Sequence, residues 1–409
     1  MQQERRLGRV LATQGQLAWL WHDGQVLQVQ LTGAAQHGQF AVEVADGWEP
    51  IEPAPATEPS SDGDFYRLSE REATRFWALK ARAAVLRAIR SFFDKRGFCE
   101  VDPPMLAHSP GLELHLDAVR AELREGMGGA PTVRYLVTSP EYHCKRLLSG
   151  GFSKIYSLQH AFRSGERGHW HNPEFMMLEW YRVDTDYRTI VADCRALVRH
   201  CAKALAGPEW APLRALPDRR PPFDARARWR NVAIRQAIHQ FAGFDPGDCQ
   251  SDARVAERAQ ESGLEVQQGD TAADILTRAL VERVEPALRD LPAVVLERWP
   301  IAMASLARPF ADAPHWAERF EIYLHGVELA NGFSELTDHV EQRRRFDVDL
   351  AARKLAGLPL YPIDERFLAA LQQGMPPAAG VALGVDRLVM ALLGLHDIAD
   401  VQAFPFERA

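Results

Sequence analysis

The chain has 409 residues, of which 46% are apolar and 25% are charged, and its net charge is −7. This profile is typical of a soluble globular protein of more than one domain, and it excludes a disordered chain, a collagen-like chain and a small disulfide scaffold. The acidic total gives no sign of a nucleic-acid partner.

The five cysteines form no CxxC pair, so we expect free thiols in a reducing compartment rather than disulfides or a zinc site. Cys194 and Cys201 are seven residues apart, which predicts one shared helix face in the core. No run approaches the roughly 20 apolar residues that a membrane span needs. The opening MQQERRLGRV is not followed by the apolar part of a secretory signal. We therefore expect a cytoplasmic protein without membrane contact.

The N-terminal residues 1–51 predict a small β module. Apolar or alternating runs such as GRVLAT, QLAWLWH, QVLQVQL and QFAVEVA are separated by short polar turns. Residues 52–66 are rich in Pro, Ala, Ser and acidic side chains, which predicts a linker. Residues 67–409 are then expected to form a second, larger domain.

Ser69 and Glu72 have the spacing of a capping box and predict the start of a helix that ends near Gly97. From there to residue 185 the pattern alternates between helices and apolar strands. Residues 190–300 read as mostly helical. Residues 318–337 and 378–392 read as strands or strand–helix segments.

Residues 161–181, AFRSGERGHWHNPEFMMLEWY, combine basic, acidic and aromatic side chains. The pattern predicts a strand that delivers Arg163, a polar loop, and a returning strand with Phe175, Met177, Glu179 and Tyr181 on one face. One interpretation is a solvated hairpin with an ion-pair network. The other is a nucleoside triphosphate site, where Arg and His bind phosphate oxygens and Phe stacks on adenine. The residues alone leave both open.

Two later segments favour the triphosphate site. Glu321 and Glu328 would face opposite sides of one straight strand, so they can converge only if residues 325–326 turn the chain. Paired carboxylates next to a triphosphate are natural Mg²⁺ ligands. The segment GVALGVDRLVMALLG, residues 380–394, predicts a glycine-flanked strand with Arg387 at the start of a helix, where a ligand can approach the backbone.

In this order, the segments resemble the signature motifs of class II aminoacyl-tRNA synthetases. Residues 86–104 resemble motif 1, residues 163–181 motif 2 and residues 384–387 motif 3. The runs TSPEYHCKRLL, HNPEF, LEWY and ELANGFSEL are similar to the lysyl branch. The sequence segments TSPEYH, HNPEFMMLEWYR and GVALGVDRLVM resemble those of the lysyl-tRNA synthetase paralogues that attach (R)-β-lysine to elongation factor P. The resemblance covers roughly residues 70–409.

This resemblance implies an α+β fold, with an antiparallel sheet flanked by helices behind the small β module, and a homodimer built on motif 1. It implies an AMP-forming ligase that uses ATP and Mg²⁺, activates (R)-β-lysine or lysine, and transfers it to elongation factor P. We do not expect tRNA as a partner, because the β module is shorter than an anticodon-binding domain. One alternative is a lysyl-tRNA synthetase with a reduced anticodon domain. The other is a non-catalytic synthetase-like regulator, which the presence of Arg163, Glu321, Glu328 and Arg387 disfavours.

The resemblance also assigns roles to single residues. The catalytic residues are Arg163 and Arg387. The Mg²⁺ ligands are Glu321 and Glu328. The ATP-binding residues are Arg163, Ser164, Gly165, Glu166, His171, Asn172, Phe175, Glu328, Leu329, Gly384 and Arg387. The residues that bind the amino-acid substrate are Ser139, Pro140, Glu141, Glu179, Tyr181, Asn331, Phe333, Glu335 and Ala382. Three glutamates match the two ammonium groups of a diamino acid, and an arginine matches its carboxylate.

Two positions depart from the pattern of the related tRNA synthetases. Their motif 2 reads Arg-x-Glu, and that Glu reads the adenine amino group, whereas Gly165 stands here. Either Glu166 or the backbone of residues 164–165 would take this role. The tRNA-charging relatives have Gly where this chain has Ala382, as the ligases do, and the added methyl would narrow the pocket against α-lysine.

Overall fold

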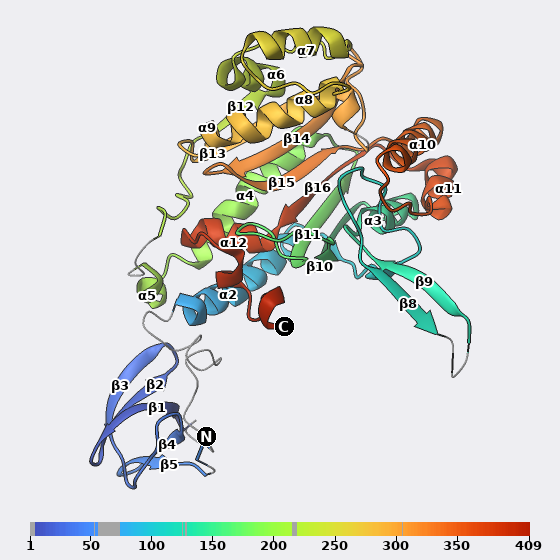
Figure 1. Cartoon of the computed structure of the whole chain (residues 1–409). Coiled ribbons are helices and arrows are strands. Elements are labelled where there is room, and N and C mark those ends of the chain that lie inside the picture. Colours follow the sequence, from blue (N-terminus) through green and yellow to red (C-terminus); the bar gives the residue numbers. More distant parts are fainter. Residues whose placement is uncertain are drawn as a thin grey trace. The chain divides into compact units, whose positions relative to one another are not determined.

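The computed structural model of the chain describes residues 5–52, 54–55, 74–124, 126, 129–214, 219–304 and 306–409 (Figure 1). The chain divides into two compact units, one of residues 1–83 and 208–218 and one of residues 84–207 and 219–409. The predicted capping box at Ser69 and most of the predicted linker lie outside the described residues, so the predicted domain boundaries stay predictions. No helix in the described ranges is long and apolar enough to cross a membrane.

The first unit contains a five-stranded antiparallel sheet with the spatial order β3-β2-β1-β4-β5. Its strands are β1 (Leu7–Gln14), β2 (Leu17–His22), β3 (Gln25–Gln30), β4 (Phe40–Val44) and β5 (Gly47–Pro50). A bridge between Leu31 and Trp48 joins the two edges of the sheet. Alternate residues such as Val10, Leu20 and Ala41 point inward and form its core. The predicted strand-rich N-terminus is therefore confirmed.

The helical parts of the first unit are the beginning of α2 (Thr74–Asp94), η1 (Pro208–Trp210) and α5 (Ala211–Arg214). Trp77 of α2 donates a hydrogen bond from Nε1 to the carbonyl oxygen of Gly24 (3.3 Å) and packs edge-on against Trp210, with ring centroids 6.4 Å apart. Aromatic packing thus holds the helical pieces of this unit on the β2–β3 turn.

The second unit is built on an eight-stranded mixed sheet with the order β12-β13-β14-β15-β16-β11-β10-β6 (Figure 1). The strands are β6 (Cys99–Glu100), β10 (Lys154–Phe162), β11 (Glu174–Val183), β12 (Trp229–Ala233), β13 (Ala293–Pro300), β14 (Trp316–Leu324), β15 (Val327–Ser334) and β16 (Ala378–Gly384). The six central strands are antiparallel, as predicted. The outer strands β12 and β6 run parallel to their neighbours, because long connections rather than hairpins join them.

Smaller elements complete this unit. A three-stranded sheet contains β7 (Leu106–Ala107), β8 (Arg120–Arg124) and β9 (Pro131–Leu136). The connection from β12 to β13 holds α6 (Ile234–Ala237), η2 (Ile238–Ala242), α7 (Asp252–Glu261), α8 (Ala272–Ala279), η3 (Leu280–Val284) and α9 (Glu285–Leu288). The remaining short helices are η4 (Ile301–Met303) after β13, and η5 (Ile398–Val401) and η6 (Phe406–Arg408) near the end of the chain. The prediction of a mostly helical stretch over residues 190–300 thus holds apart from strands β12 and β13.

The longer helices pack against the large sheet or against one another. They are α3 (Glu141–Ser149), α4 (Tyr187–Ala204), α10 (His339–Leu355), α11 (Glu365–Gly374) and α12 (Val385–Leu393). Tyr187 at the start of α4 stacks on Phe320 of β14 (6.2 Å between ring centroids), so α4 covers the face opposite to Glu321. Cys194 and Cys201 are both buried on α4, as their spacing predicts. Tyr142 of α3 stacks on Phe367 of α11, with ring centroids 4.7 Å apart.

Candidate active site

Two rows of residues run across the central strands on the same face of the large sheet. Each residue in a row lies directly opposite the next one on the neighbouring strand. From β11 to β14, the first row is Glu179, Ala382, Asn331 and Glu321. The second row is Tyr181, Gly380, Phe333 and Arg319. Because residues two apart on a strand share a face, the predicted alternation from Phe175 to Tyr181 places these side chains together.

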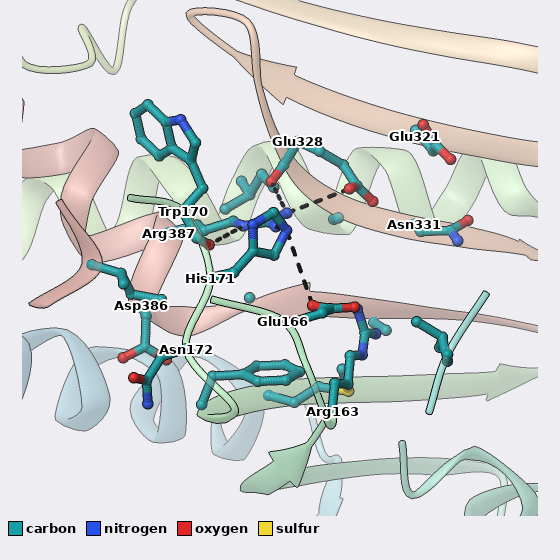
Figure 2. Close-up of a pocket in the computed structure, with 18 of the residues that line it drawn as sticks. Arg163, Glu166, Trp170, His171, Asn172, Glu321, Glu328, Asn331, Asp386 and Arg387 are labelled. Carbon is teal, nitrogen blue, oxygen red and sulfur yellow. Dashed lines mark hydrogen bonds and ion pairs between the residues drawn. The ribbon is translucent and has the colours of Figure 1, made fainter. Parts of the chain in front are cut away.

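A cavity of about 330 Å³ opens on this face (Figure 2). The predicted site residues that line it are Arg163, Glu166, His171, Asn172, Phe175, Glu321, Glu328, Leu329, Asn331, Ala382, Gly384 and Arg387. Lining residues that the sequence analysis missed are Leu116, Trp170, Met177, Arg319, Ala330, Asp386 and Ile398. The structure thus gathers segments separated by more than two hundred residues around one space.

A tight hairpin brings Glu321 and Glu328 to the same face. His325 and Gly326 form the turn, both with positive φ (48° and 76°), which is the conformation of the turns that suit two-residue hairpins. Glu328 consequently lies opposite Tyr323. A bulge after Ile322 then shifts the register, and Asn331 joins the same face opposite Glu321. The predicted chain reversal at residues 325–326 is confirmed.

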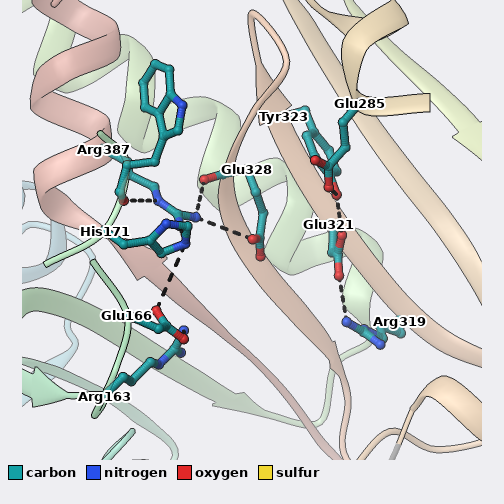
Figure 3. Close-up of polar contacts among 10 residues, drawn as sticks. Arg163, Glu166, His171, Glu285, Arg319, Glu321, Tyr323, Glu328 and Arg387 are labelled. Atoms are coloured by element: carbon teal, nitrogen blue, oxygen red, sulfur yellow. Dashed lines mark hydrogen bonds and ion pairs between the residues drawn. The ribbon is translucent and has the colours of Figure 1, made fainter. Parts of the chain in front are cut away.

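Glu321 is held at both carboxylate oxygens (Figure 3). Arg319 donates from Nη2 to Oε1 (2.6 Å) and the Tyr323 hydroxyl donates to Oε2 (2.7 Å). The same hydroxyl lies 3.4 Å from Oε1 of Glu285. Burial, together with the charge of Glu328, raises the pKa of Glu321 to about 7 against the opposing charge of Arg319. Arg319 and Tyr323 therefore fix the carboxylate of Glu321 in one orientation.

Arg387 joins motif 3 to the opposite wall of the cavity (Figure 3). Its Nη1 donates to the backbone oxygen of Glu328 (2.9 Å) and lies 3.3 Å from Oε2 of the same residue. Its Nη2 lies 2.8 Å from Nε2 of His171, and its Nε donates to the Trp170 carbonyl (3.2 Å). Burial and the charge of Arg387 lower the pKa of His171, so the neutral ring can accept this hydrogen bond.

Arg163 lies on the other side of the cavity, with its guanidinium 5.1 Å from the ring centre of Phe175. Glu166 lies between Arg163 and the neutral His171, 3.7 Å from Arg163 Nη1 and 4.0 Å from His171 Nε2. The buried Nε of Arg163 has no hydrogen-bond partner among the described residues. A buried donor of this kind is costly unless a ligand satisfies it.

Two of the predicted nucleotide contacts, Ser164 and Gly165, do not line the cavity. The backbone N–H of Ser164 donates to the Asp117 carbonyl (2.7 Å). Gly165 turns the loop with φ +82°, and no atom lies within 4 Å of the position that a Cβ would occupy. The next residue, Glu166, points its side chain into the cavity instead (Figure 2). Of the two alternatives predicted for reading adenine, only Glu166 lines the cavity.

The other predicted substrate residues form a buried group that does not line this cavity. Glu179, fully buried, accepts hydrogen bonds from the Ser139 hydroxyl (2.6 Å) and the Tyr181 hydroxyl (2.8 Å). Pro140 directly precedes helix α3, and the backbone N–H of Glu141 donates to the Ser139 hydroxyl oxygen (3.0 Å). Burial, and then the charge of Glu141, raise the pKa of Glu179 to about 8.

Lys145 is a buried cation in this group that the sequence analysis missed. Its Nζ lies 2.5 Å from Oε1 of Glu141 and 2.6 Å from Oε2 of Glu335, and its side chain is fully buried. The ammonium also lies 5.1 Å from the ring centre of Phe333. Burial alone would lower the pKa of Lys145, but the two glutamates raise it above its ordinary value. The spacing of Glu141 and Lys145 on one helix is the only local signal that could have revealed this pair.

Asp386 is a second residue that the sequence analysis did not single out. It is buried at the start of α12, and its Oδ2 accepts a hydrogen bond from the backbone N–H of Met176 (2.7 Å). This contact ties motif 3 to the first residues of β11. The hydrogen bond thereby holds Arg387, which follows Asp386, and Phe175, which precedes Met176, on facing sides of the cavity.

Comparison with known proteins is in line with this geometry. The family described as tRNA synthetases class II (D, K and N) matches residues 64–408. The protein named elongation factor P--(R)-beta-lysine ligase from Proteus mirabilis is 38% identical over 337 residues, which cover 81% of this chain and 95% of the relative. Its namesake from Edwardsiella ictaluri is 40% identical with the same coverage. That from Haemophilus ducreyi is 35% identical over 349 residues, 85% of this chain and 100% of the relative. The chain therefore belongs to the class II tRNA synthetase family of the D, K and N group, together with these ligases.

Proposed function

We propose that this protein is an ATP-dependent ligase that activates (R)-β-lysine as an adenylate and transfers it to a lysine side chain of elongation factor P. The observation that carries the proposal is the division of the site on one sheet face. A cavity with basic and aromatic walls suits a nucleotide, and the same row of the sheet continues into a buried acidic group that suits amines. The names of the similar ligases support the same activity.

The cavity residues fit ATP. Phe175 offers a flat surface to adenine and Arg387 a planar cation for its other side, while Arg163 and His171 supply groups that bind phosphate oxygens. Glu166 lines the cavity and would accept a hydrogen bond from the adenine amino group. A Cβ at Gly384 would meet only ordinary contacts with Arg387, so the protein's own packing does not require the glycine and the free space suits a ligand.

Glu321 and Glu328 fit a bound Mg²⁺. No group of three or more His, Cys, Asp and Glu in the described part of the chain is arranged to hold a metal ion by itself. Two carboxylates suffice for Mg²⁺, which usually binds one or two carboxylates together with substrate phosphates. The ion would neutralise charge on the triphosphate. Arg319 and Tyr323 orient Glu321 for this task through both of its oxygens.

The acidic group fits a diamino acid by its charge. With Glu141, Glu179 and Glu335 ionised and Lys145 protonated, this group carries a net charge of 1 − 3 = −2. The two ammonium groups of β-lysine or lysine would balance it. A monoamine would leave a buried carboxylate without a cation, at a cost of about 1–3 kcal/mol or more. Lys145 therefore belongs to the specificity of the site, although it would not contact the reacting atoms.

The first chemical step is adenylate formation. The substrate carboxylate is already ionised at neutral pH, so it can attack the α-phosphorus of ATP without a side-chain base, and pyrophosphate leaves. Arg163 faces the cavity with a buried, unpaired Nε and would stabilise the charge that develops on the α-phosphate oxygens.

In the second step, the amine of the acceptor lysine attacks the adenylate carbonyl carbon and AMP leaves. This amine must be neutral, and the nearby carboxylates oppose its deprotonation. The transfer rate should therefore rise with pH through the neutral range.

The decisive experiment compares acceptors. We expect ATP–pyrophosphate exchange with β-lysine in preference to α-lysine, and transfer of the labelled amino acid to purified elongation factor P. Charging of lysine tRNA without transfer to elongation factor P would favour the lysyl-tRNA synthetase alternative. Absence of exchange with either amino acid would favour a non-catalytic regulator.

We also propose that the protein acts as a homodimer through motif 1. Strand β6 lies at the edge of the large sheet and, among the described strands, pairs only with β10. A few residues further along the chain, Met105 and Leu106 are 46% and 39% exposed. An open strand edge and exposed apolar side chains are features that a second copy of the chain can cover.

A further inference from the structure

The loop of residues 164–173 between β10 and β11 brings Glu166, His171 and Asn172 to the cavity. Within the loop, the backbone groups of Gly168 and His171 bond to each other in both directions (3.1 Å each). At the base of the loop, the backbone N–H of Arg163 donates a hydrogen bond to the carbonyl oxygen of residue 173 (2.9 Å). Most residues from 164 to 171 are exposed. Burial of apolar surface therefore does not hold this loop, and polar contacts must.

One set of polar contacts comes from the C-terminal segment, by which we mean residues 397–408. The backbone N–H of Ile398 donates to the carbonyl of His169 (2.8 Å). Oδ2 of Asp397 lies 2.8 Å from Nδ1 of the same histidine. The side chain of Ile398 itself lines the cavity. The C-terminal segment thus forms hydrogen bonds with the middle of the loop, and it also contributes Ile398 to the cavity wall.

A second set lies at the end of the segment. Arg167 donates from Nη2 to Oε1 of Glu407 (2.7 Å), and its guanidinium lies 4.6 Å from the ring centre of Phe406. The backbone N–H of Phe406 donates to Oδ1 of Asn172 (3.1 Å). Nδ2 of Asn172 donates to the Glu174 carbonyl (2.6 Å), so its amide is fixed at both ends.

We infer that the C-terminal segment is a positioning element for the nucleotide. Its contacts reach loop residues 167 and 169, which neighbour the cavity-lining residues 166 and 170, and residue 172, which lines the cavity itself. Loosening the segment would let Glu166 and His171 leave the cavity, while the acidic group on β11 and α3 would stay in place. The inference rests on the proposed function only in taking this cavity as the ATP site. The residues of the segment are positioning residues and take no part in the chemistry.

Charge reversal tests the contact at the end of the segment. Arg167→Glu and Glu407→Arg should each raise the KM for ATP in pyrophosphate exchange by about threefold to tenfold, because an exposed ion pair becomes a repulsion. The KM for β-lysine and kcat should not change. The double variant Arg167→Glu with Glu407→Arg should recover the parent KM for ATP. Arg235→Glu is the matched control, because its ion pair with Asp245 (2.6 Å) is similarly exposed and lies outside the cavity lining.

Two substitutions at one position test the hydrogen bond to Asn172. Phe406→Ala removes the ring but keeps the backbone N–H. Phe406→Pro removes both, at the first residue of η6, where proline is well tolerated. We expect Phe406→Pro to raise the KM for ATP about threefold more than Phe406→Ala, in line with the loss of one hydrogen bond. If either Phe406 variant folds poorly, the inference is still tested by whether the double variant Arg167→Glu with Glu407→Arg recovers the parent KM for ATP.

Calorimetric titration with ATP and Mg²⁺, without amino acid, separates the two hypotheses. If the parent binds ATP and all variants bind it equally while their Tm falls, the segment is only structural and the inference fails, but the proposed function stands. If the parent binds ATP and the variants bind it weakly, yet no diamino acid supports exchange, the inference stands and the proposed function fails. Absence of ATP binding by the parent would overturn both.

Discussion

Glu328 is the residue at which metal binding can be tested with the least damage to the fold. Glu328→Gln removes one charge, but Arg387 remains anchored, because it also bonds the backbone oxygen of residue 328. We expect adenylate formation to fall by about a hundredfold or more, since electrostatic stabilisation is a large part of phosphoryl chemistry. Pyrophosphate exchange at the parent rate would show that Glu328 is not a ligand.

The buried acidic group predicts a pH-dependent affinity for the amino acid. Burial raises the pKa of Glu179 to about 8, and it also raises the pKa of Glu335 against the opposing charge of Lys145. Below about pH 8 Glu179 therefore holds a proton that an incoming ammonium group must displace. The KM for β-lysine should therefore fall as pH rises toward about 8 and then level off. Glu179→Gln should weaken binding and flatten this dependence, and a KM that is constant with pH would contradict the assignment.

These raised pKa values also set the sign of a stability effect. A carboxyl that titrates near pH 8 when folded and near its ordinary value of 4.5 when unfolded holds more protons in the folded state between these values. The free protein must therefore lose stability as pH rises through that window. Bound substrate would offset the loss, because its ammonium groups replace the protons.

Ala382 is the residue most directly placed to distinguish two isomeric amino acids. It lines the cavity and lies opposite both Glu179 and Asn331, at the junction of the nucleotide and amine ends. We expect Ala382→Gly to raise exchange with α-lysine relative to β-lysine, with an effect of about 1 kcal/mol for one methyl group. The measurement is the ratio of the two kcat/KM values. An unchanged ratio would remove Ala382 from the specificity of the site.

Among the elements, the β14–β15 hairpin depends on one glycine. Gly326 has φ 76°, and a Cβ there would lie 2.7 Å from Cγ and 3.0 Å from the backbone nitrogen of Arg289. Gly326→Ala should lower the free energy of unfolding by about 1–3 kcal/mol and reduce exchange, because Glu328 follows the turn closely. The matched control is Gly357→Ala, with φ 68° but open space, which should lose only stability in a denaturant titration. Equal exchange rates in both variants would separate the turn from the metal site.

Local patterns predicted the parts of the site that lie within single segments. Alternation on residues 175–181 identified one face of β11, and the parity of Glu321 and Glu328 required the turn at His325. Contacts between distant segments left no such signal. Lys145 and Glu335 belong to different elements, 190 residues apart, and nothing in either segment shows that they pair. The contact of Arg167 with Glu407 could not be predicted for the same reason. The parallel edge strands also follow from long-range connections that periodicity does not encode.

The whole molecule should be a dimer if motif 1 forms an interface. We expect light scattering at micromolar concentration to report twice the chain mass. A charged substitution such as Leu106→Glu, at a 39% exposed position on β7, should shift the protein toward monomers and lower activity. A monomer that keeps full activity would contradict the proposal. Cys99→Ser, on the exposed edge strand itself, is a conservative control that should leave the mass unchanged.

The family match begins at residue 64, and the similar ligases are covered almost completely by 81–85% of this chain. The family model does not extend over residues 1–63, and the predicted domain boundary near residue 66 stays a prediction. Their strands were predictable from alternating residues alone.

The row from Glu179 to Glu321 has a dynamic consequence. Its backbone amides belong to the ladders of four central strands, so they can meet solvent only if these strands separate. In a hydrogen–deuterium exchange experiment they should be as slow as global unfolding allows, whereas the amides of residues 164–171 should exchange early. If the proposed roles hold, the residues that select the amino acid lie on paired central strands, and those that bind the nucleotide lie partly on an exposed loop. Variation during evolution should accordingly retune nucleotide affinity more readily than the choice of amino acid.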